Sequence, residues 1–296
     1  MAATAFDRAL WTWAAPLSFV LLWSSGFAFA KLGLEDADPL TFLALRYAVV
    51  LVILVPLALV LRPPLPKSPR TWAHIAAVGF LIQVVYFSFS YLAVTKGLSA
   101  SANALIAALQ PILVALASPL LLREQVGAKR WLGLLLGLSG AALVILARAA
   151  VETTTPLGVT LSVLALLALA AATLYERRFG VEAHPVSANL IQYVIGFAFL
   201  LPLAALLEPM RVVWTVNLGI ALAYLVIANS LISVTLLLAM LRRGEAARVS
   251  ALFFLTPPMA ALVAFAVLGE PLPPLAWVGM AVAGAGVALA TRVTSR

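Results

Sequence analysis

The residues best able to do chemistry in this chain are amides and hydroxyls set inside long apolar stretches. Gln83, Tyr86 and Ser90 follow one another at helical spacing, so one helix would present all three on one face. Asn229 lies 146 residues after Gln83, and Ser233 follows it one turn later. Amides and hydroxyls are costly in hydrocarbon unless they are hydrogen-bonded, so they should face a cavity or another helix. The chemistry they suit is the binding of a small molecule with polar and apolar ends.

Other candidates for a binding cavity are expected at a similar depth. Asn103 and Gln110 share a helical face, and Thr256 lies 146 residues after Gln110. Trp23 and Phe27 are one turn apart and suit stacking on a flat or apolar substrate. The alternatives are hydrogen bonding between helices for the polar residues and plain packing for the two aromatic residues.

A third group consists of candidate hinges and gates. Pro111 and Pro257, inside apolar stretches, each remove a backbone hydrogen bond and kink a helix, either as hinges or as static bends. Glu124 and Glu270 suit caps for the helices that follow them, or a pair of gates. Two basic residues are expected toward the outer face, where long side chains reach the interface, form an outer gate or contact an anion. They are Lys31 and Arg46.

Residue sets typical of enzymes are missing from the sequence. It has no cysteine, no HExxH motif, no acidic and histidine residues at metal-ligand spacing and no glycine-rich phosphate loop. Its two histidines, His74 and His184, fall at the ends of apolar stretches. No Asp or Glu falls in the middle of such a stretch, which argues against a buried proton relay. We therefore expect no enzyme activity, no catalytic residue, no metal and no cofactor.

The composition is that of a protein dissolved in lipid. Apolar residues make up 64% of the 296 residues and charged residues only 10%, whereas charged residues form about a quarter of a soluble domain. The basic residues are scattered rather than clustered on one face, so the pI of about 10.3 does not indicate nucleic-acid binding. We expect a small-molecule substrate and membrane lipid as partners, no nucleic acid, and a monomer or homodimer.

Ten apolar runs predict ten transmembrane helices. Each is close to the ~20 residues that cross a ~30 Å hydrocarbon layer, where the backbone must bond to itself. The first run resembles a cleavable secretory signal, but we expect it to be retained because its loss would leave the sixth run without a counterpart. The predicted spans are about 11–33, 39–61, 71–95, 99–121, 128–148, 156–178, 185–207, 215–239, 246–268 and 273–292.

The sequence repeats itself at an offset of 146 residues, which divides it into residues 1–150 and 151–296. Five spans per half is an odd number, so the second half starts from the opposite face as an inverted repeat. Of the 19 lysines and arginines, 14 fall in loops on one side and four on the other, which predicts cytoplasmic termini. The matching residues are Leu109, Pro111, Glu124, Trp131, Gly133 and Gly140 with Leu255, Pro257, Glu270, Trp277, Gly279 and Gly286.

In the fifth and tenth predicted spans, small residues recur every three or four positions, as at Gly133, Gly137 and Gly140. Such faces let two helices approach closely. They predict helix packing either within the monomer or between protomers, and not contacts with substrate.

The paired proline, glutamate and glycine tracts, the run from Trp23-Ser24-Ser25-Gly26 to Lys31, and Leu45-Arg46-Tyr47 resemble the drug/metabolite transporter superfamily in its ten-helix EamA-type branch. The resemblance covers nearly the whole chain. It implies an inner-membrane secondary transporter that works by alternating access around a central cavity and exports small metabolites, including neutral or aromatic amino acids. The second half departs from the first, since Gln192 replaces Arg46 and Leu169 replaces Trp23, so the halves cannot contribute equally to a site.

The leading hypothesis is therefore an exporter of amino acids or similar small metabolites. A cavity with aromatic rings, amides and hydroxyls but no fixed central charge suits a zwitterion. Nucleobases, drugs and other flat neutral or cationic compounds are the alternative cargoes. An integral-membrane enzyme and a passive channel are the alternatives of a different class.

Overall fold

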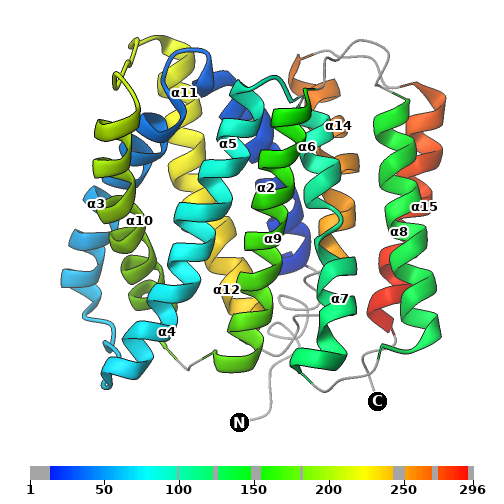
Figure 1. The fold of residues 1–296 in the computed structure, drawn as a ribbon, viewed down its shortest axis with the longest axis horizontal. Coiled ribbons are helices and arrows are strands. Elements are labelled where there is room, and N and C mark those ends of the chain that lie inside the picture. The colour runs from blue at the N-terminus through cyan, green and yellow to red at the C-terminus, as the bar shows by residue number, and fades with distance from the viewer. Residues whose placement is uncertain are drawn as a thin grey trace.

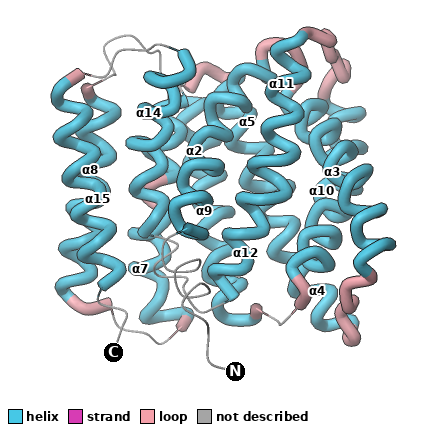
Figure 2. The backbone as a smooth tube through the Cα atoms, turned by 180° about the vertical axis from the view of Figure 1, so that it is seen from behind, coloured by secondary structure: helices cyan, strands magenta, loops and turns pink. Residues whose placement is uncertain are grey.

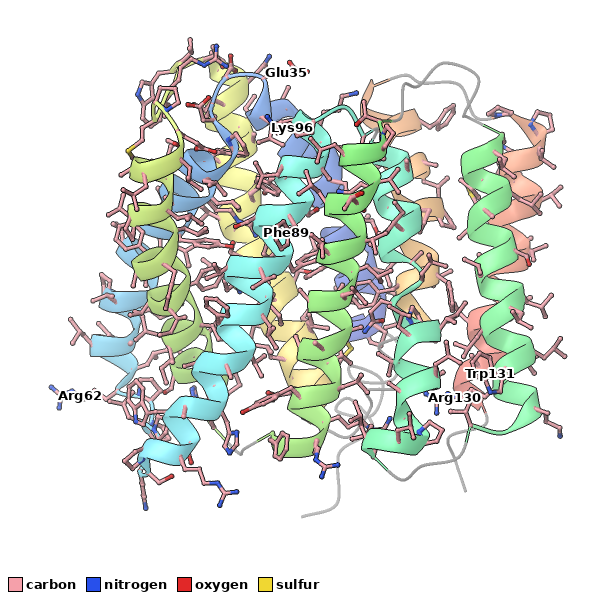
Figure 3. The ribbon with its side chains drawn as sticks, viewed as in Figure 1. Glu35, Arg62, Phe89, Lys96, Arg130 and Trp131 are labelled. Atoms are coloured by element: carbon pink, nitrogen blue, oxygen red, sulfur yellow. The ribbon has the colours of Figure 1, made fainter. Side chains whose placement is uncertain are left out.

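The computed structural model describes residues 14–98, 100–122, 126–147, 155–180, 183–242, 251–268 and 273–292. Within these ranges helices are the regular elements, and one isolated bridge pairs Ala37 with Val212. The helices stand side by side, and most run from one face of the molecule to the other (Figure 1). Figure 3 labels Glu35 and Lys96 at one end and Arg62 and Arg130 at the other, and we call these ends the Glu35 face and the Arg62 face.

The first half consists of a series of helices that begins at the Arg62 face. They are α2 (Ala15–Leu34), α3 (Pro39–Leu61), α4 (Pro69–Gly79), η2 (Phe80–Tyr86), α5 (Phe87–Thr95), α6 (Ala100–Ala107), α7 (Gln110–Leu121) and α8 (Ala128–Leu146). The second half repeats the order from the Glu35 face. Its helices are α9 (Pro156–Phe179), α10 (Pro185–Leu207), α11 (Val216–Tyr224), η4 (Leu225–Ser233), α12 (Val234–Arg242), η5 (Phe253–Leu255), α14 (Thr256–Leu268) and α15 (Pro274–Arg292).

The described helices have the length and the surface of membrane spans. Six are long and apolar enough to cross a bilayer, among them the continuous helices Pro69–Thr95 and Val216–Met240, and shorter apolar helices accompany them. Large apolar side chains point outward, as at Val60 and Leu120, which are 79% and 85% exposed. An outer surface of this kind is stable only in lipid. The predicted all-α membrane fold is therefore confirmed.

Corresponding helices of the two halves run in opposite directions. The helix α10 begins beside the end of α3, where the Ser187 hydroxyl donates to the Pro64 carbonyl, and ends beside the start of α3 at Leu40. The helices α8 and α15 lie side by side with opposite directions in both views (Figures 1 and 2). The halves also interlock, since α2 packs against α11, η4 and α14, and α9 packs against α5, η2 and α7. The predicted inverted repeat is thus seen in the helix directions.

The fourth and ninth predicted spans are not continuous α-helices. The fourth breaks between Ala107 and Gln110, just before Pro111, and the second half has the short 3-10 helix η5 just before Pro257. A proline has no N–H to donate and its ring clashes with the preceding turn, so the α-helical ladder is interrupted there. The α-helical hydrogen-bonding pattern is therefore interrupted next to both predicted prolines.

The third and eighth spans each contain a π-helical segment at mid-length, η2 and η4. Bonding from residue i to i+5 widens the helix and disturbs the regular backbone ladder. Tyrosines at equivalent positions donate to carbonyls of these segments: Tyr47 to Gln83 at 2.8 Å and Tyr193 to Ser230 at 3.2 Å. The two tyrosine rings meet edge to face with centroids 5.2 Å apart, so they join the two halves at their centre.

Loops from both halves are joined at the Glu35 face. The Glu208 carboxylate accepts hydrogen bonds from the Leu40 N–H at 2.9 Å and from the N–H and hydroxyl of Thr41 at 2.8 Å each. It therefore caps the N-terminus of α3, where an acidic group is favoured. Asp38 and Arg211 add two more bonds, because the Asp38 N–H donates to the Arg211 carbonyl and the Arg211 N–H to the Asp38 carboxylate.

The glycine faces of α8 and α15 pack on each other within the monomer. A Cβ atom at Gly140 would lie 2.2 Å from the backbone nitrogen of Ala283 and 2.6 Å from the Gly279 carbonyl oxygen. A Cβ at Gly286 would lie 2.2 Å from the backbone nitrogen of Gly137. The backbones of the two helices are therefore in direct contact. The glycines were predicted to pack helices either within the monomer or between protomers, and the structure shows packing within the monomer.

Gly140→Ala is expected to destabilise the protein by about 1–3 kcal/mol, because the new methyl group meets backbone atoms that cannot move independently. Gly284→Ala in α15 is the matched control, since nothing lies within 4 Å of its Cβ position. Thermal unfolding of the purified variants in detergent, followed as loss of the monodisperse peak, measures the difference. Equal unfolding temperatures for the two variants would contradict the contact.

Glu208→Ala is expected to lower the unfolding free energy by about 1–3 kcal/mol, because the first turn of α3 loses charged hydrogen-bond acceptors. The same unfolding assay applies. Glu35→Ala is the control, since Glu35 is an exposed acid on the same face. An unchanged Glu208→Ala protein would show that the loop contacts do not need the carboxylate.

Candidate functional site

A cavity lies between the two halves at the level of η2 and η4. Its empty space is about 400 Å³, including its open side, and its wall comes from α2, α3, η2, α5, α6 and η4. It reaches Leu34 and Val94, which are close to the Glu35 face. In Figure 3 Phe89 of α5 lies about midway between the two faces. Six of the ten predicted cavity residues lie in its wall: Trp23, Phe27, Tyr86, Ser90, Asn103 and Asn229.

One side of the cavity is aromatic. The Trp23 ring stacks on Tyr86 with centroids 6.0 Å apart and planes 18° apart, and it lies tilted against Phe87 at 6.1 Å. Phe253 closes the back of Trp23 edge to face at 5.5 Å. Trp23 is only 2% exposed, and its indole Nε1–H has no acceptor among the described residues. Buried indole N–H groups normally find a partner, so this donor lacks the hydrogen bond expected of it.

Arg46 forms part of the cavity wall and is completely buried. Its Nε donates to the Ser230 hydroxyl at 2.8 Å, one terminal nitrogen to the Tyr91 hydroxyl at 3.0 Å, and the other to the Asn229 side-chain oxygen at 2.6 Å. The guanidinium carbon lies 4.7 Å from the centre of the Phe87 ring. The expectation that the Arg46 side chain reaches the outer interface is wrong. Hydrogen-bond acceptors from both halves hold the side chain inside the protein.

A chain of hydrogen bonds supports the wall beside α6. The Asn103 amide donates to the Ser90 hydroxyl at 2.9 Å, and Ser162 of α9 donates to the Asn103 side-chain oxygen at 2.7 Å. Both ends of the Asn103 amide are therefore fixed by neighbouring helices. Asn103 and Ser90 therefore form hydrogen bonds between helices and also line the cavity. Both of the roles considered for such polar residues apply here.

The remaining predicted cavity residues are buried but outside this wall. Gln110 donates to the Thr173 hydroxyl of α9 at 2.9 Å, which is helix-to-helix bonding. Gln83 packs against α10, where a Cβ at Gly196 would lie 2.9 Å from the Gln83 Cβ. Ser233 and Thr256 are 0% and 1% exposed.

The predicted hinge and gate residues are spread over the molecule. Pro111 and Pro257 stand at the helix breaks described above, and both are buried. Lys31 is exposed in the last turn of α2, toward the Glu35 face. Glu124 and Glu270 lie outside the described residues.

Sequence analysis missed Phe87 and Tyr91 in the cavity wall and gave Arg46 a different position. Gln83, Tyr86 and Ser90 share a face only if the helix is regular, and η2 interrupts that regularity. After η2, Phe87 and Tyr91 join Tyr86 and Ser90 at the cavity. A signal for Arg46 was available, because an ionisable residue inside a transmembrane span is by default a candidate for function.

The sequence profile of the EamA-like transporter family matches residues 11–146 and again residues 156–292. The chain belongs to the EamA-like transporter family. The double match also agrees with the two halves seen in the fold. Family membership and the names of relatives indicate a transporter of small molecules rather than an enzyme.

Two relatives of this EamA-like protein are named as transporters without a stated cargo, and the name of a third states no activity. The uncharacterized transporter YvbV of Bacillus subtilis is 27% identical over 259 residues, covering 86% of this chain and 82% of its own. An uncharacterized transporter of Synechocystis is 26% identical, covering 88% and 83%. A WAT1-related chloroplastic protein of Arabidopsis thaliana is 27% identical, covering 91% and 67%.

A solved structure has the same fold. A crystal structure whose title names no function superimposes with a TM-score of 0.78, covering 95% of this EamA-like chain and 96% of its own, at 21% sequence identity. At this identity the likeness concerns the fold alone.

Proposed function

We propose that this EamA-like protein is a secondary transporter of the cytoplasmic membrane. It exports neutral or aromatic amino acids, or similar small metabolites, by alternating access. The observation that carries the proposal is the cavity at mid-depth between two inverted halves, with aromatic rings on one side and hydrogen-bonding groups on the other. Inverted-repeat transporters place their cargo in this position. A lining of aromatic rings with a few polar groups among them is typical of small-molecule sites.

The unequal packing of the two halves supports alternating access. Trp23 and Arg46 lie in the wall of the cavity, whereas their counterparts Leu169 and Gln192 do not. The cavity extends toward the Glu35 face, where Leu34 and Val94 lie in its wall. A carrier built from two such halves, residues 1–150 and 151–296, exposes its site to the other face when the halves exchange arrangements.

The distribution of charge supports an orientation with the Arg62 face in the cytoplasm. Basic residues at the ends of described helices on that face include Arg62, Arg70, Lys129, Arg130 and Arg178. Lys31, Lys96 and Arg211 are on the Glu35 face. Short loops rich in lysine and arginine stay in the cytoplasm. Export then means release of cargo through the opening at the Glu35 face.

Purified protein in liposomes tests the proposal. A panel of radiolabelled amino acids, nucleobases and cationic dyes is offered, and saturable uptake with counterflow is expected for neutral or aromatic amino acids. Counterflow of nucleobases or dyes, without counterflow of amino acids, would show that the proposed cargo is wrong. Flux that does not saturate would indicate a channel.

Tyr86→Ala and Asn229→Ala are each expected to lower transport of the identified cargo about tenfold or more, without lowering the amount of folded protein. Tyr86→Ala removes the stacking partner of Trp23, and Asn229→Ala removes the shortest hydrogen bond to the Arg46 charge, a bond worth about 1.5–3 kcal/mol. Asn217→Ala, at an exposed position in α11, is the control. Normal transport by both cavity variants would show that the cargo binds elsewhere.

A further inference from the structure

We infer that Arg46 binds the carboxylate of the cargo, so that the cavity selects molecules in which a carboxylate adjoins an apolar or aromatic body. The inference rests on the proposed function, because it names the group by which the same cavity recognises its cargo. It also replaces the expectation of a cavity without a central charge.

The charge of Arg46 has no counterion among the described residues. Its hydrogen-bond partners Ser230, Tyr91 and Asn229 are all neutral, and no carboxylate of the described chain forms an ion pair with it. A guanidinium group is not deprotonated in proteins, so the side chain is charged at any physiological pH. A buried charge without a partner of opposite sign is costly, and a bound anion removes that cost.

The guanidinium group still has capacity to bind an anion. It carries five N–H donors, of which the three hydrogen bonds above use three, and the Tyr193 hydroxyl also lies close to the group. The two that remain are on the terminal nitrogens, and the planar fork of arginine matches the two oxygens of a carboxylate. The side chain is already fixed by its three bonds, so little conformational entropy is lost when the cargo binds.

The second half shows that the framework does not require this charge. Gln192 is the counterpart of Arg46, and it is followed by Tyr193 as Arg46 is followed by Tyr47. Gln192 is also completely buried and its amide has no hydrogen-bond partner among the described residues, so the fold accommodates a neutral side chain at the equivalent place. Of the two equivalent residues, only Arg46 lines the cavity, and only Arg46 is charged. This associates the charge with the cargo.

The surroundings of Arg46 define the rest of the cargo. Phe87 lies against the guanidinium at 4.7 Å and against the Trp23 ring at 6.1 Å, so it connects the charged part of the wall with the aromatic part. The unpaired Trp23 Nε1–H is a second donor in a wall that already holds a positive charge. Both features favour a molecule that brings hydrogen-bond acceptors and a flat or apolar body, and both disfavour cationic compounds.

Isothermal titration calorimetry on the purified full-length protein tests the inference with two pairs of probes. The first pair is L-phenylalanine and L-phenylalaninamide, which differ only in the carboxylate, and the second is benzoate and benzamide. We expect the carboxylate compound of a pair to bind at least about tenfold more tightly, the size of a charged hydrogen-bond pair. Equal binding within both pairs would overturn the inference.

Variants locate the preference at Arg46. Arg46→Gln introduces the residue that the second half has at this position. It is expected to reduce the ratio of the two binding affinities, carboxylate over amide, to about one. Arg46→Lys keeps the charge without the planar fork and tests the same position if the glutamine variant does not fold. We expect it to keep part of the ratio. Arg62→Gln, at an exposed arginine on the Arg62 face, is the control with the same chemical change and should keep the full ratio.

The same measurements separate the two proposals. Tight binding of benzoate without transport of any amino acid would support the carboxylate site and contradict the proposed cargo. Transport of amino acids with equal binding of phenylalanine and its amide would support the cargo and overturn the role of Arg46. A ratio that survives in both Arg46 variants would also overturn that role.

Discussion

The buried positive charge of Arg46 is the constraint around which this membrane protein is organised. A guanidinium in hydrocarbon is tolerated only where protein groups surround it with hydrogen-bond acceptors and polarisable surface. Here the acceptors come from both halves, since Tyr91 belongs to the first and Asn229 and Ser230 belong to the second. The charge therefore depends on the two halves meeting, and it holds them together where the cavity lies.

The π-helical segments η2 and η4 lie where the two halves meet. Asn229 and Ser230 lie in the π-helical segment η4, which packs against α3, and η2 occupies the matching place in the first half. Tyrosine hydroxyls from α3 and α10 satisfy carbonyls of these two segments, so the departures from regular α-helix do not leave those groups unpaired in lipid. The close packing of α8 on α15 is separate from the cavity and fixes the far edge of the bundle (Figure 1).

Much of the fold could be predicted because lipid limits the choices. Apolar runs of a set length in a bilayer must be helices, and a repeat with an odd number of them must be inverted. The offset of 146 residues that relates Pro111 to Pro257 also relates η2 to the central part of η4. What the pattern could not give is helix geometry, because nothing in the residue types around Gln83 indicates that the helix widens there.

The candidate site was predicted in part for the same reason. Trp23, Tyr86 and Asn229 were identified by their depth and polarity, and they line the cavity. Gln83 and Asn229 are counterparts by sequence, yet only Asn229 reaches the cavity, because the halves are packed unequally in this structure. A repeat offset carries no information about which of two equivalent positions is open. Arg46 was misplaced because its acceptors come from η4, more than 180 residues later in the chain.

The central claim is that one side of the interface between the halves is open and the equivalent side is closed. The chain has no natural cysteine, so single-cysteine variants in lipid nanodiscs, where both faces meet water, measure this directly. Val94→Cys, in the cavity wall, should react with a membrane-impermeant thiol reagent and be protected by cargo. Its repeat counterpart Met240→Cys, at a completely buried position, should stay unreactive. Equal labelling of the two positions, or faster labelling of Met240→Cys, would contradict the account.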